Sequence, residues 1–301
     1  MIRTKFVPAA LRACAAFALV ALATRGSAQT IVDVGGFEAA SGYSTAFNPM
    51  LPGTYVGQLE GQVPFASYPN GTWQVPVGGT GTSTATVVGG VNSPLGPAGT
   101  QAIELVKGNA DARWGVHNST FPSPGRTQIC IDWDMMVLGP AGTPGTDFGP
   151  FFGVESYYDQ GGLPYPVHGW LGVDGTTGAV LIGEAGTGNF KSPDGLTAVA
   201  FGDWNSFRIV LDFPTNSYVS FLNGVQLGPA EGFVDGVIPF FTDAPLAVLA
   251  EGTPWANLTG TAYVDNFSIH EGLFCIIPEP GTIVLAVLGL TGIAAGRRRW
   301  A

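Results

Sequence analysis

The sequence predicts an all-β protein built as an antiparallel β-sandwich. Between Gln29 and Ile277, apolar residues never recur at i, i+3, i+4 and i+7 for three turns, so the helical pattern is missing. Short alternating or wholly apolar runs recur instead, separated by clusters of Gly, Pro, Asn and Asp. No Pro- or Ser-rich linker divides this stretch, and about 250 residues fit a single β domain.

The strands are expected wherever β-branched and aromatic residues run between turn residues. In chain order, we expect them at Thr84 to Val88, Gln101 to Val106, Gln128 to Leu138, Phe148 to Tyr158, His168 to Val173, Ala179 to Ile182, Ser206 to Asp212, Ser217 to Leu222 and Ala262 to His270. Asn223-Gly224 predicts a tight hairpin, because both residues tolerate positive φ. Thr176-Thr177-Gly178 predicts a second turn.

The order of these segments resembles the concanavalin A-like jelly roll of lectin, glucanase and laminin-G-like domains. The resemblance covers residues 31–271 and includes the strand from Trp204 to Phe213, the hairpin from Ser217 to Gly228 and the closing strand from Ala262 to Ile269. It implies a jelly-roll domain over residues 29–274.

Residues 1–28 have the pattern of a secretory signal peptide. Arg3, Lys5 and Arg12 precede or interrupt an apolar run, and Gly26-Ser27-Ala28 supplies small residues for cleavage before Gln29. We therefore expect export through the inner membrane.

The C-terminal end has three parts: Pro278-Glu279-Pro280, an apolar stretch from Thr282 to Gly296, and the basic residues Arg297, Arg298 and Arg299. The apolar stretch is short for a membrane helix, which needs roughly 20 residues, and the arginines favour a cytoplasmic end. Together the parts resemble the PEP-CTERM sorting signal of diderm bacteria. The resemblance implies a sorting segment at 275–301, transient membrane attachment by a transmembrane helix, exosortase as partner, and delivery to the cell surface or extracellular matrix. An ordinary C-terminal anchor is the alternative.

The charge balance excludes one class of partner. Residues 29–278 contain five Lys and Arg but twenty-one Asp and Glu, a difference of 16. Without a basic patch, the surface cannot neutralise phosphates, so we expect no nucleic-acid binding.

Two cysteines, Cys130 and Cys275, remain after the predicted signal peptide. In an oxidising compartment they can form one disulfide that ties the C-terminal strand to the middle of the domain. The alternative is a buried Cys130 and a free Cys275 thiol.

The acids of the longest strand are the first candidates for chemistry. Asp132 and Asp134 alternate with apolar residues and therefore share one face of the strand. The catalytic strand of jelly-roll glucanases resembles Glu-x-Asp-x-x-Glu, and no third acid follows here. We therefore expect no catalysis by this pair and no enzyme.

Saccharide binding is predicted for aromatic residues beside acids. Tyr157, Tyr158 and Asp159 lie where a strand meets a loop and are expected to form an exposed platform, with Asp132 and Asp134 as further candidates. Trp133 and Trp204 are expected in the core. No cofactor is predicted, although loop acids such as Asp159, Asp174 and Asp194 are candidate calcium ligands.

Three functions remain open from the sequence. The favoured one is a secreted, exosortase-sorted surface or matrix protein whose jelly roll mediates adhesion or contacts extracellular polysaccharide without catalysis. The others are a lectin with a defined sugar ligand and a glycoside hydrolase whose catalytic acids come from unexpected positions.

Overall fold

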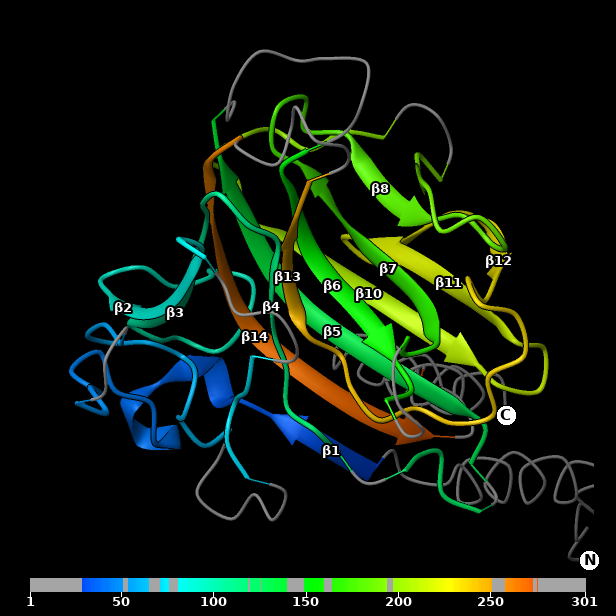
Figure 1. Cartoon of the computed structure of the whole chain (residues 1–301), viewed down its shortest axis with the longest axis horizontal. Helices are drawn as coiled ribbons and strands as arrows, with labels where there is room; N and C mark the ends of the chain where they lie inside the picture. The colour runs from blue at the N-terminus through cyan, green and yellow to red at the C-terminus, as the bar shows by residue number, and fades with distance from the viewer. Residues whose placement is uncertain are drawn as a thin grey trace, which may run out of the picture.

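The protein is an antiparallel β-sandwich of the jelly-roll type, as the sequence predicts (Figure 1). The computed structural model describes residues 29–50, 54–64, 71–75, 81–118, 120–124, 126–139, 149–159, 164–193, 197–250, 258–272 and 275. Within these residues the strands form two facing sheets, and two short 3-10 helices, Gly35–Phe37 and Ala39–Ser41, follow the first strand.

The larger sheet has eight strands, in the order β12-β11-β10-β5-β14-β3-β2, and β1 pairs with the end of β14. Its strands are β1 (Gln29–Asp33), β2 (Thr84–Gly89), β3 (Gln101–Lys107), β5 (Gln128–Leu138), β10 (Asn205–Asp212), β11 (Ser217–Leu222), β12 (Val225–Gly232) and β14 (Gly260–Gly272). β14 lies beside β5 along most of its length, with β3 and then β1 on its other side. The last strand of the domain is thus central in this sheet.

The smaller sheet has six strands, in the order β4-β13-β6-β7-β8-β9. They are β4 (Ala112–Trp114), β6 (Phe151–Tyr157), β7 (Val167–Asp174), β8 (Val180–Gly183), β9 (Phe190–Lys191) and β13 (Leu246–Leu249). All nine predicted strands are present, within a few residues of the expected ends. The short strands β1, β4, β9 and β13, and the second hairpin arm β12, were not predicted as separate strands.

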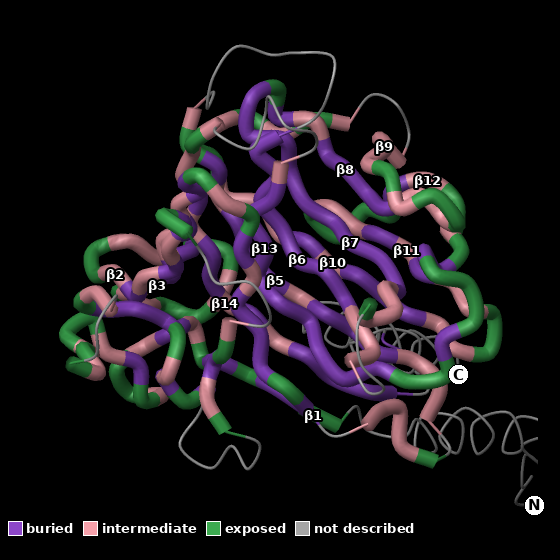
Figure 2. The backbone as a smooth tube through the Cα atoms, in the orientation of Figure 1, coloured by how far each residue is buried: buried purple, intermediate pink, exposed green. Residues whose placement is uncertain are grey.

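The core lies between the two sheets because each strand alternates inward apolar residues with outward ones. On β5 the inward set includes Trp133, which is 1% exposed and stacks on Phe207 with ring centroids 5.6 Å apart. Figure 2 shows this buried layer running along the central strands, with exposed backbone mainly in the connections. The predicted core position of Trp133 is confirmed.

The predicted hairpin at Asn223-Gly224 is also confirmed. It joins β11 to β12 with Leu222 opposite Val225, and both turn residues have positive φ, 49° and 76°. Gly178, with φ of 76°, ends the predicted turn between β7 and β8.

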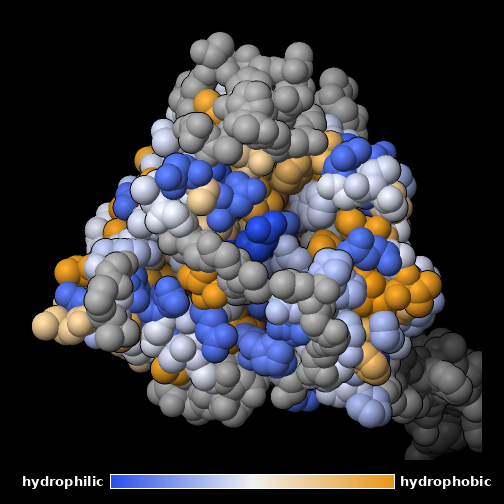
Figure 3. Space-filling view, viewed as in Figure 1, coloured by the Kyte–Doolittle hydropathy of each residue, from blue (hydrophilic) through white to orange (hydrophobic). Residues whose placement is uncertain are grey.

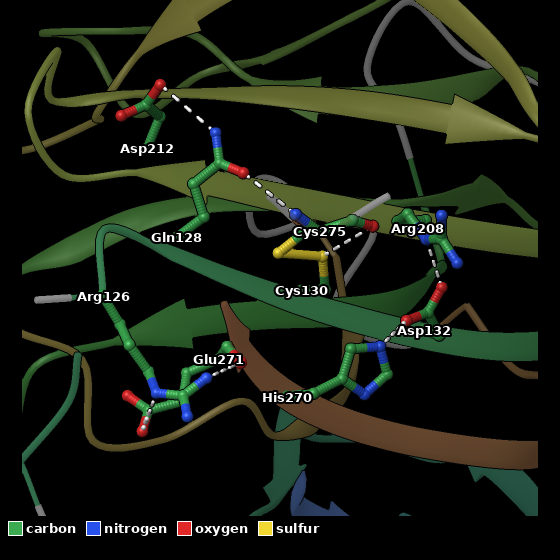
Figure 4. The surroundings of a disulfide bond; sticks show 9 residues. All are labelled: Arg126, Gln128, Cys130, Asp132, Arg208, Asp212, His270, Glu271 and Cys275. Carbon is green, nitrogen blue, oxygen red and sulfur yellow. Dashed lines mark hydrogen bonds and ion pairs between the residues drawn. A yellow bond between two sulfur atoms is a disulfide. The ribbon is translucent and has the colours of Figure 1, made fainter. Parts of the chain in front are cut away.

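Cys130 and Cys275 are joined by a disulfide (Figure 4). Cys130 faces outward from β5, and Cys275 lies three residues beyond the end of β14. The Gln128 side chain accepts a hydrogen bond from the Cys275 backbone N–H, at 3.1 Å. The bridge therefore attaches the end of the domain to the outer face of the eight-stranded sheet.

The two predicted end segments lie outside the described residues. They include the signal peptide, the Pro278-Glu279-Pro280 motif, the apolar stretch and the arginines Arg297, Arg298 and Arg299. Within the described ranges, no helix is long and apolar enough to cross a bilayer.

Candidate functional site

The outer face of the six-stranded sheet has a row of ionisable side chains, which we call the ionisable strip. On β4 and β6, the residues that alternate with the core residues point away from the eight-stranded sheet. Because β13 lies between β4 and β6, side chains from both strands and from the chain just before β13 meet on this face. The strip comprises Arg113, His117, Glu155, Tyr157, Asp159 and Asp243.

Glu155 is the centre of the first half of the strip. Its carboxylate is 4% exposed, accepts a hydrogen bond from the Nε–H of Arg113 and accepts another from the Tyr157 hydroxyl at 2.6 Å. Arg113 Nε is also 2.9 Å from the Tyr157 hydroxyl oxygen. The three groups form a closed triangle in which the buried carboxylate is paired with a cation, as a buried charge requires.

These contacts shift two pKa values. Burial lowers the pKa of Arg113, but the charge of Glu155 and the adjacent Tyr157 outweigh it and raise the pKa above its usual value. Burial and the Glu155 carboxylate raise the pKa of Tyr157 well above 10, against a smaller opposite effect of Arg113. At neutral pH the Tyr157 hydroxyl therefore keeps its proton.

Asp243 is the centre of the second half of the strip. It belongs to the segment that leads into β13, and its backbone carbonyl accepts the N–H of Tyr157 at 2.8 Å. Its neighbours are Asp159 and His117, which pair with each other at 2.8 Å between Asp159 Oδ2 and His117 Nδ1. His117 is 45% exposed, so the pair connects buried Asp243 to the surface.

Burial raises the pKa of Asp243 to about 7, and the nearby charge of Asp159 adds to the effect. His117 and the backbone hydrogen bonds of Val116 and Ala244 lower the pKa, but by less than burial raises it. A large fraction of this carboxyl is therefore protonated near neutral pH, so it can donate a proton.

Gly115 makes room for Asp243. Gly115 directly follows β4, and its Cα faces the strip. A Cβ built there would be only 2.5 Å from Asp243 Oδ2. Within the described part of the chain, Asp243 Oδ1 is buried and has no hydrogen-bond partner. Such an atom costs stability, and a catalytic role is one explanation for its retention.

The strip lies on the face that Figure 3 presents, which is the side of β6, β7 and β13 in Figure 1. Hydrophilic side chains lie at the middle of this face and also near its rim, with hydrophobic ones interspersed among them. The apolar neighbours include Trp170 on β7, which is opposite Glu155 in the strand register.

The predicted platform of Tyr157 and Tyr158 does not form. Because successive side chains alternate along the chain, the two tyrosines lie on opposite faces. The Tyr157 hydroxyl belongs to the strip. Tyr158 packs against the core, and its ring centroid is 5.9 Å from that of Phe240. Asp159 joins the strip through His117. Of the predicted saccharide candidates, Tyr157 and Asp159 thus come together.

Asp132 and Asp134 share the outer face of the eight-stranded sheet, as expected from their spacing, and are therefore on the opposite side of the molecule from the strip. Asp132 pairs with Arg208 and with His270, whose Nε2 is 2.9 Å from Asp132 Oδ2. Asp134 accepts hydrogen bonds from Ser93 and Asn266, each at 2.7 Å. Burial is the main cause that raises the pKa of Asp134.

The two described candidate calcium ligands, Asp159 and Asp174, are already paired with protein groups. Both oxygens of Asp174 accept hydrogen bonds, from Gly149, Thr176 and Thr177, and Asp159 pairs with His117. Asp194 lies outside the described residues. In the described ranges, no group of three or more His, Cys, Asp or Glu side chains has the arrangement of a metal site.

Comparison with known proteins places the fold in context. No protein family matches the sequence, and no curated protein is similar to it. Among solved structures, the catalytic domain of the glycoside hydrolase family 131 protein from Coprinopsis cinerea aligns over 82% of this chain and 96% of its own, with 14% identity and a TM-score of 0.43. Cellulose induced protein Cip1 aligns over 65% and 90%, with 14% identity and a TM-score of 0.45.

The endo-beta-1,4-glucuronan lyase from the fungus Trichoderma reesei aligns over 67% of this chain and 91% of its own, with 11% identity and a TM-score of 0.42. The chain spans only 16% of the length of a similar sialidase. Likenesses at these identities concern the fold and assign no reaction to this chain.

The expectation that the protein is not an enzyme is contradicted by these comparisons. Most of the similar structures are named as enzymes: alginate lyases, the glucuronan lyase and the family 131 glycoside hydrolase. The expectation rested on the missing third acid after Asp134, which concerned one strand of the eight-stranded sheet only. The ionisable strip is on the other sheet.

Four residues of the strip were not predicted as site residues from the sequence: Arg113, His117, Glu155 and Asp243. Glu155 and Tyr157 are two residues apart on a predicted strand, and this spacing was the available signal for a shared face. Asp243 gave no such signal, because its segment is irregular and only the pairing of β13 with β4 and β6 brings it to the strip.

Proposed function

We propose that this protein is an exported glycoside hydrolase that cleaves neutral polysaccharide at the ionisable strip. The observation that carries the proposal is the contrast between two acids on one face. Asp243 has its pKa raised to about 7, whereas Glu155 is paired with the guanidinium of Arg113. Hydrolysis of a glycosidic bond uses one protonated and one ionised carboxyl.

The roles follow from these environments. Asp243 donates its proton to the glycosidic oxygen, so the leaving sugar departs as an alcohol. Glu155 provides the carboxylate that assists attack at the anomeric carbon, and water supplies the hydroxyl group of the new reducing end. Arg113 and the Tyr157 hydroxyl hold Glu155 in place.

The charge of the chain favours a neutral substrate. The difference of 16 between acidic and basic residues over 29–278 repels polyanions, and Arg113 on the strip is already neutralised by Glu155. A polymer without carboxylates or sulfates avoids this repulsion. Elimination at a uronate would instead require a cation free to bind the substrate carboxylate.

Release of reducing ends tests this function. Purified protein incubated with soluble β-glucan, xylan and galactomannan is expected to liberate new reducing ends from at least one of them. Two results count against the proposal: no product from any neutral polymer, and products with an unsaturated, ultraviolet-absorbing end from alginate or another uronate polymer, which indicate a lyase.

We further propose that the protein reaches the cell surface or matrix through the signal peptide and the C-terminal sorting segment, with exosortase as its processing partner. The support is the order of Pro278-Glu279-Pro280, apolar stretch and arginines. Replacing Glu279 with Ala is expected to leave the tailed protein in the membrane fraction, whereas Glu60→Ala is sorted normally. Release of the Glu279→Ala protein in normal amount and size would refute this route.

A further inference from the structure

A groove crosses the outer face of the eight-stranded sheet, opposite the ionisable strip. Its volume is about 850 Å³, within the range of ligand pockets, and its floor is made by β5, β10 and β11. The proposed hydrolysis makes no use of it. Its lining divides into an apolar half and a polar half, and each half restricts what can bind.

The apolar half contains the disulfide. Cys130, Val210 and Cys275 are buried together, and Val219 and Phe221 pack against them. Trp204, directly before β10, also lines the groove and is half-buried, so its expected place in the core is wrong. The outward Phe221 and Trp204 provide aromatic surface with only part of each ring covered.

The polar half is built around Asp132. Arg208 on β10 is directly opposite Asp132 on β5, and His270 on β14 approaches Asp132 from the other side, as Figure 4 shows. His270 is 10% exposed, whereas the Arg208 side chain is 32% exposed. Although His270 Nε2 lies 2.9 Å from Asp132 Oδ2, the two atoms do not form a hydrogen bond, whereas the Arg208 Nε–H donates one to Asp132 Oδ1.

Arg208 has capacity for a ligand. Among the described residues, its only hydrogen bond and ion pair are with Asp132, through Nε. A planar guanidinium held at Nε keeps its other N–H groups in a fixed direction, which favours recognition of paired oxygen atoms.

The charge of the groove indicates a neutral ligand. Of its described lining residues, Asp132 and Arg208 are the two charged ones, and their charges cancel. Ser206 and Asn223 add uncharged polar groups. A pyranose ring matches this lining, because its C–H face packs on aromatic side chains and each hydroxyl both donates and accepts hydrogen bonds.

We propose that this groove is a second saccharide site, which binds a neutral polysaccharide chain on the face opposite the ionisable strip. Trp204 and Phe221 contact the C–H faces of the sugar rings, and Arg208 with Asp132 binds adjacent hydroxyls. Two sites on opposite faces allow one molecule to hold a polymer while it cleaves another segment, or to connect two chains. The groove site does not depend on the strip being catalytic.

Affinity electrophoresis tests this site, with soluble β-glucan, xylan or galactomannan cast into native gels and alginate as the anionic comparison. The protein is expected to be retarded by at least one neutral polymer and not by alginate. Trp204→Ala is expected to weaken this retardation by roughly tenfold in apparent affinity. Phe240→Ala is the matched control, because Phe240 is an exposed aromatic residue, 40% accessible, that does not line the groove.

Two further variants separate the groove from the strip. Arg208→Lys keeps the charge beside Asp132 but removes the planar fork, and is expected to weaken retardation while thermal unfolding stays near that of the wild type. Glu155→Gln, in the strip, is expected to leave the groove-dependent retardation in place. The inference is overturned if no neutral polymer retards the protein, if Trp204→Ala is retarded like the wild type, or if Glu155→Gln abolishes all retardation.

Discussion

Replacing Glu155 with Gln is expected to lower the rate of reducing-end release by about 10²- to 10⁴-fold, the usual contribution of a positioned acid or base. Gln has nearly the same shape and still accepts a hydrogen bond, but it has no charge to assist attack at the anomeric carbon. It also removes the ion pair between Glu155 and Arg113. The loss is expected in kcat, since the carboxylate acts on the reacting bond.

The matched control is Glu231→Gln. Glu231 also forms a salt bridge, with Lys191 at 2.8 Å, but it belongs to β12 of the eight-stranded sheet and is not part of the strip. Its activity is expected to stay within about twofold of the wild type, as is usual for partly exposed ion pairs. Similar losses in both variants would indicate a general effect of removing a charge and would exclude a specific role for Glu155.

Asp243→Asn is expected to abolish the proton donor and, in the same protein, to change how stability depends on pH. Wild-type activity should decline above pH 7 as Asp243 loses its proton, because its pKa is about 7. The variant should show little activity at any pH, so this decline disappears. A pH-rate profile of kcat/KM measures both effects.

Asp243→Asn is expected to lower activity but to raise the stability of the fold at high pH. Because the pKa of Asp243 is raised on folding, the folded state binds more protons than the unfolded state between about pH 4 and pH 7, and stability falls as pH rises through that window. Above pH 8 the full cost of the buried charge applies, up to about 4 kcal/mol. Asn carries no charge, so the thermal midpoint of Asp243→Asn should exceed that of the wild type at pH 8 and match it more closely at pH 5. If the difference in thermal midpoint between the variant and the wild type is the same at pH 5 and pH 8, the pKa of Asp243 is not raised.

The sandwich was predictable because its signals are local. The eleven-residue strand Gln128–Leu138 alternates so regularly that both its inward core and its outward acids follow from the sequence. The Asn223-Gly224 turn fixes its hairpin by its own backbone preference. Strands as short as β4 and β9 contain too few residues to show an alternation of apolar and polar residues. They are recognised as strands only by their pairing with β13 and β8.

The candidate site was less predictable because it is assembled across strands that are distant in the sequence. Arg113 and Glu155 are 42 residues apart, and they meet only because both β4 and β6 pair with β13. The tyrosine pair was placed on one surface because it adjoins a loop, whereas strand alternation continues through Tyr157 and separates the two rings. The raised pKa of Asp243 depends on burial that no local pattern reveals.

The most direct measurement is a crystal structure of the Glu155→Gln variant soaked with an oligosaccharide of the polymer that the wild type cleaves. Sugar density is expected along the outer face of β4, β13 and β6, with a glycosidic oxygen within hydrogen-bonding distance of the Asp243 carboxyl. It would be contradicted by an empty strip at saturating oligosaccharide, or by sugar bound on the eight-stranded sheet alone.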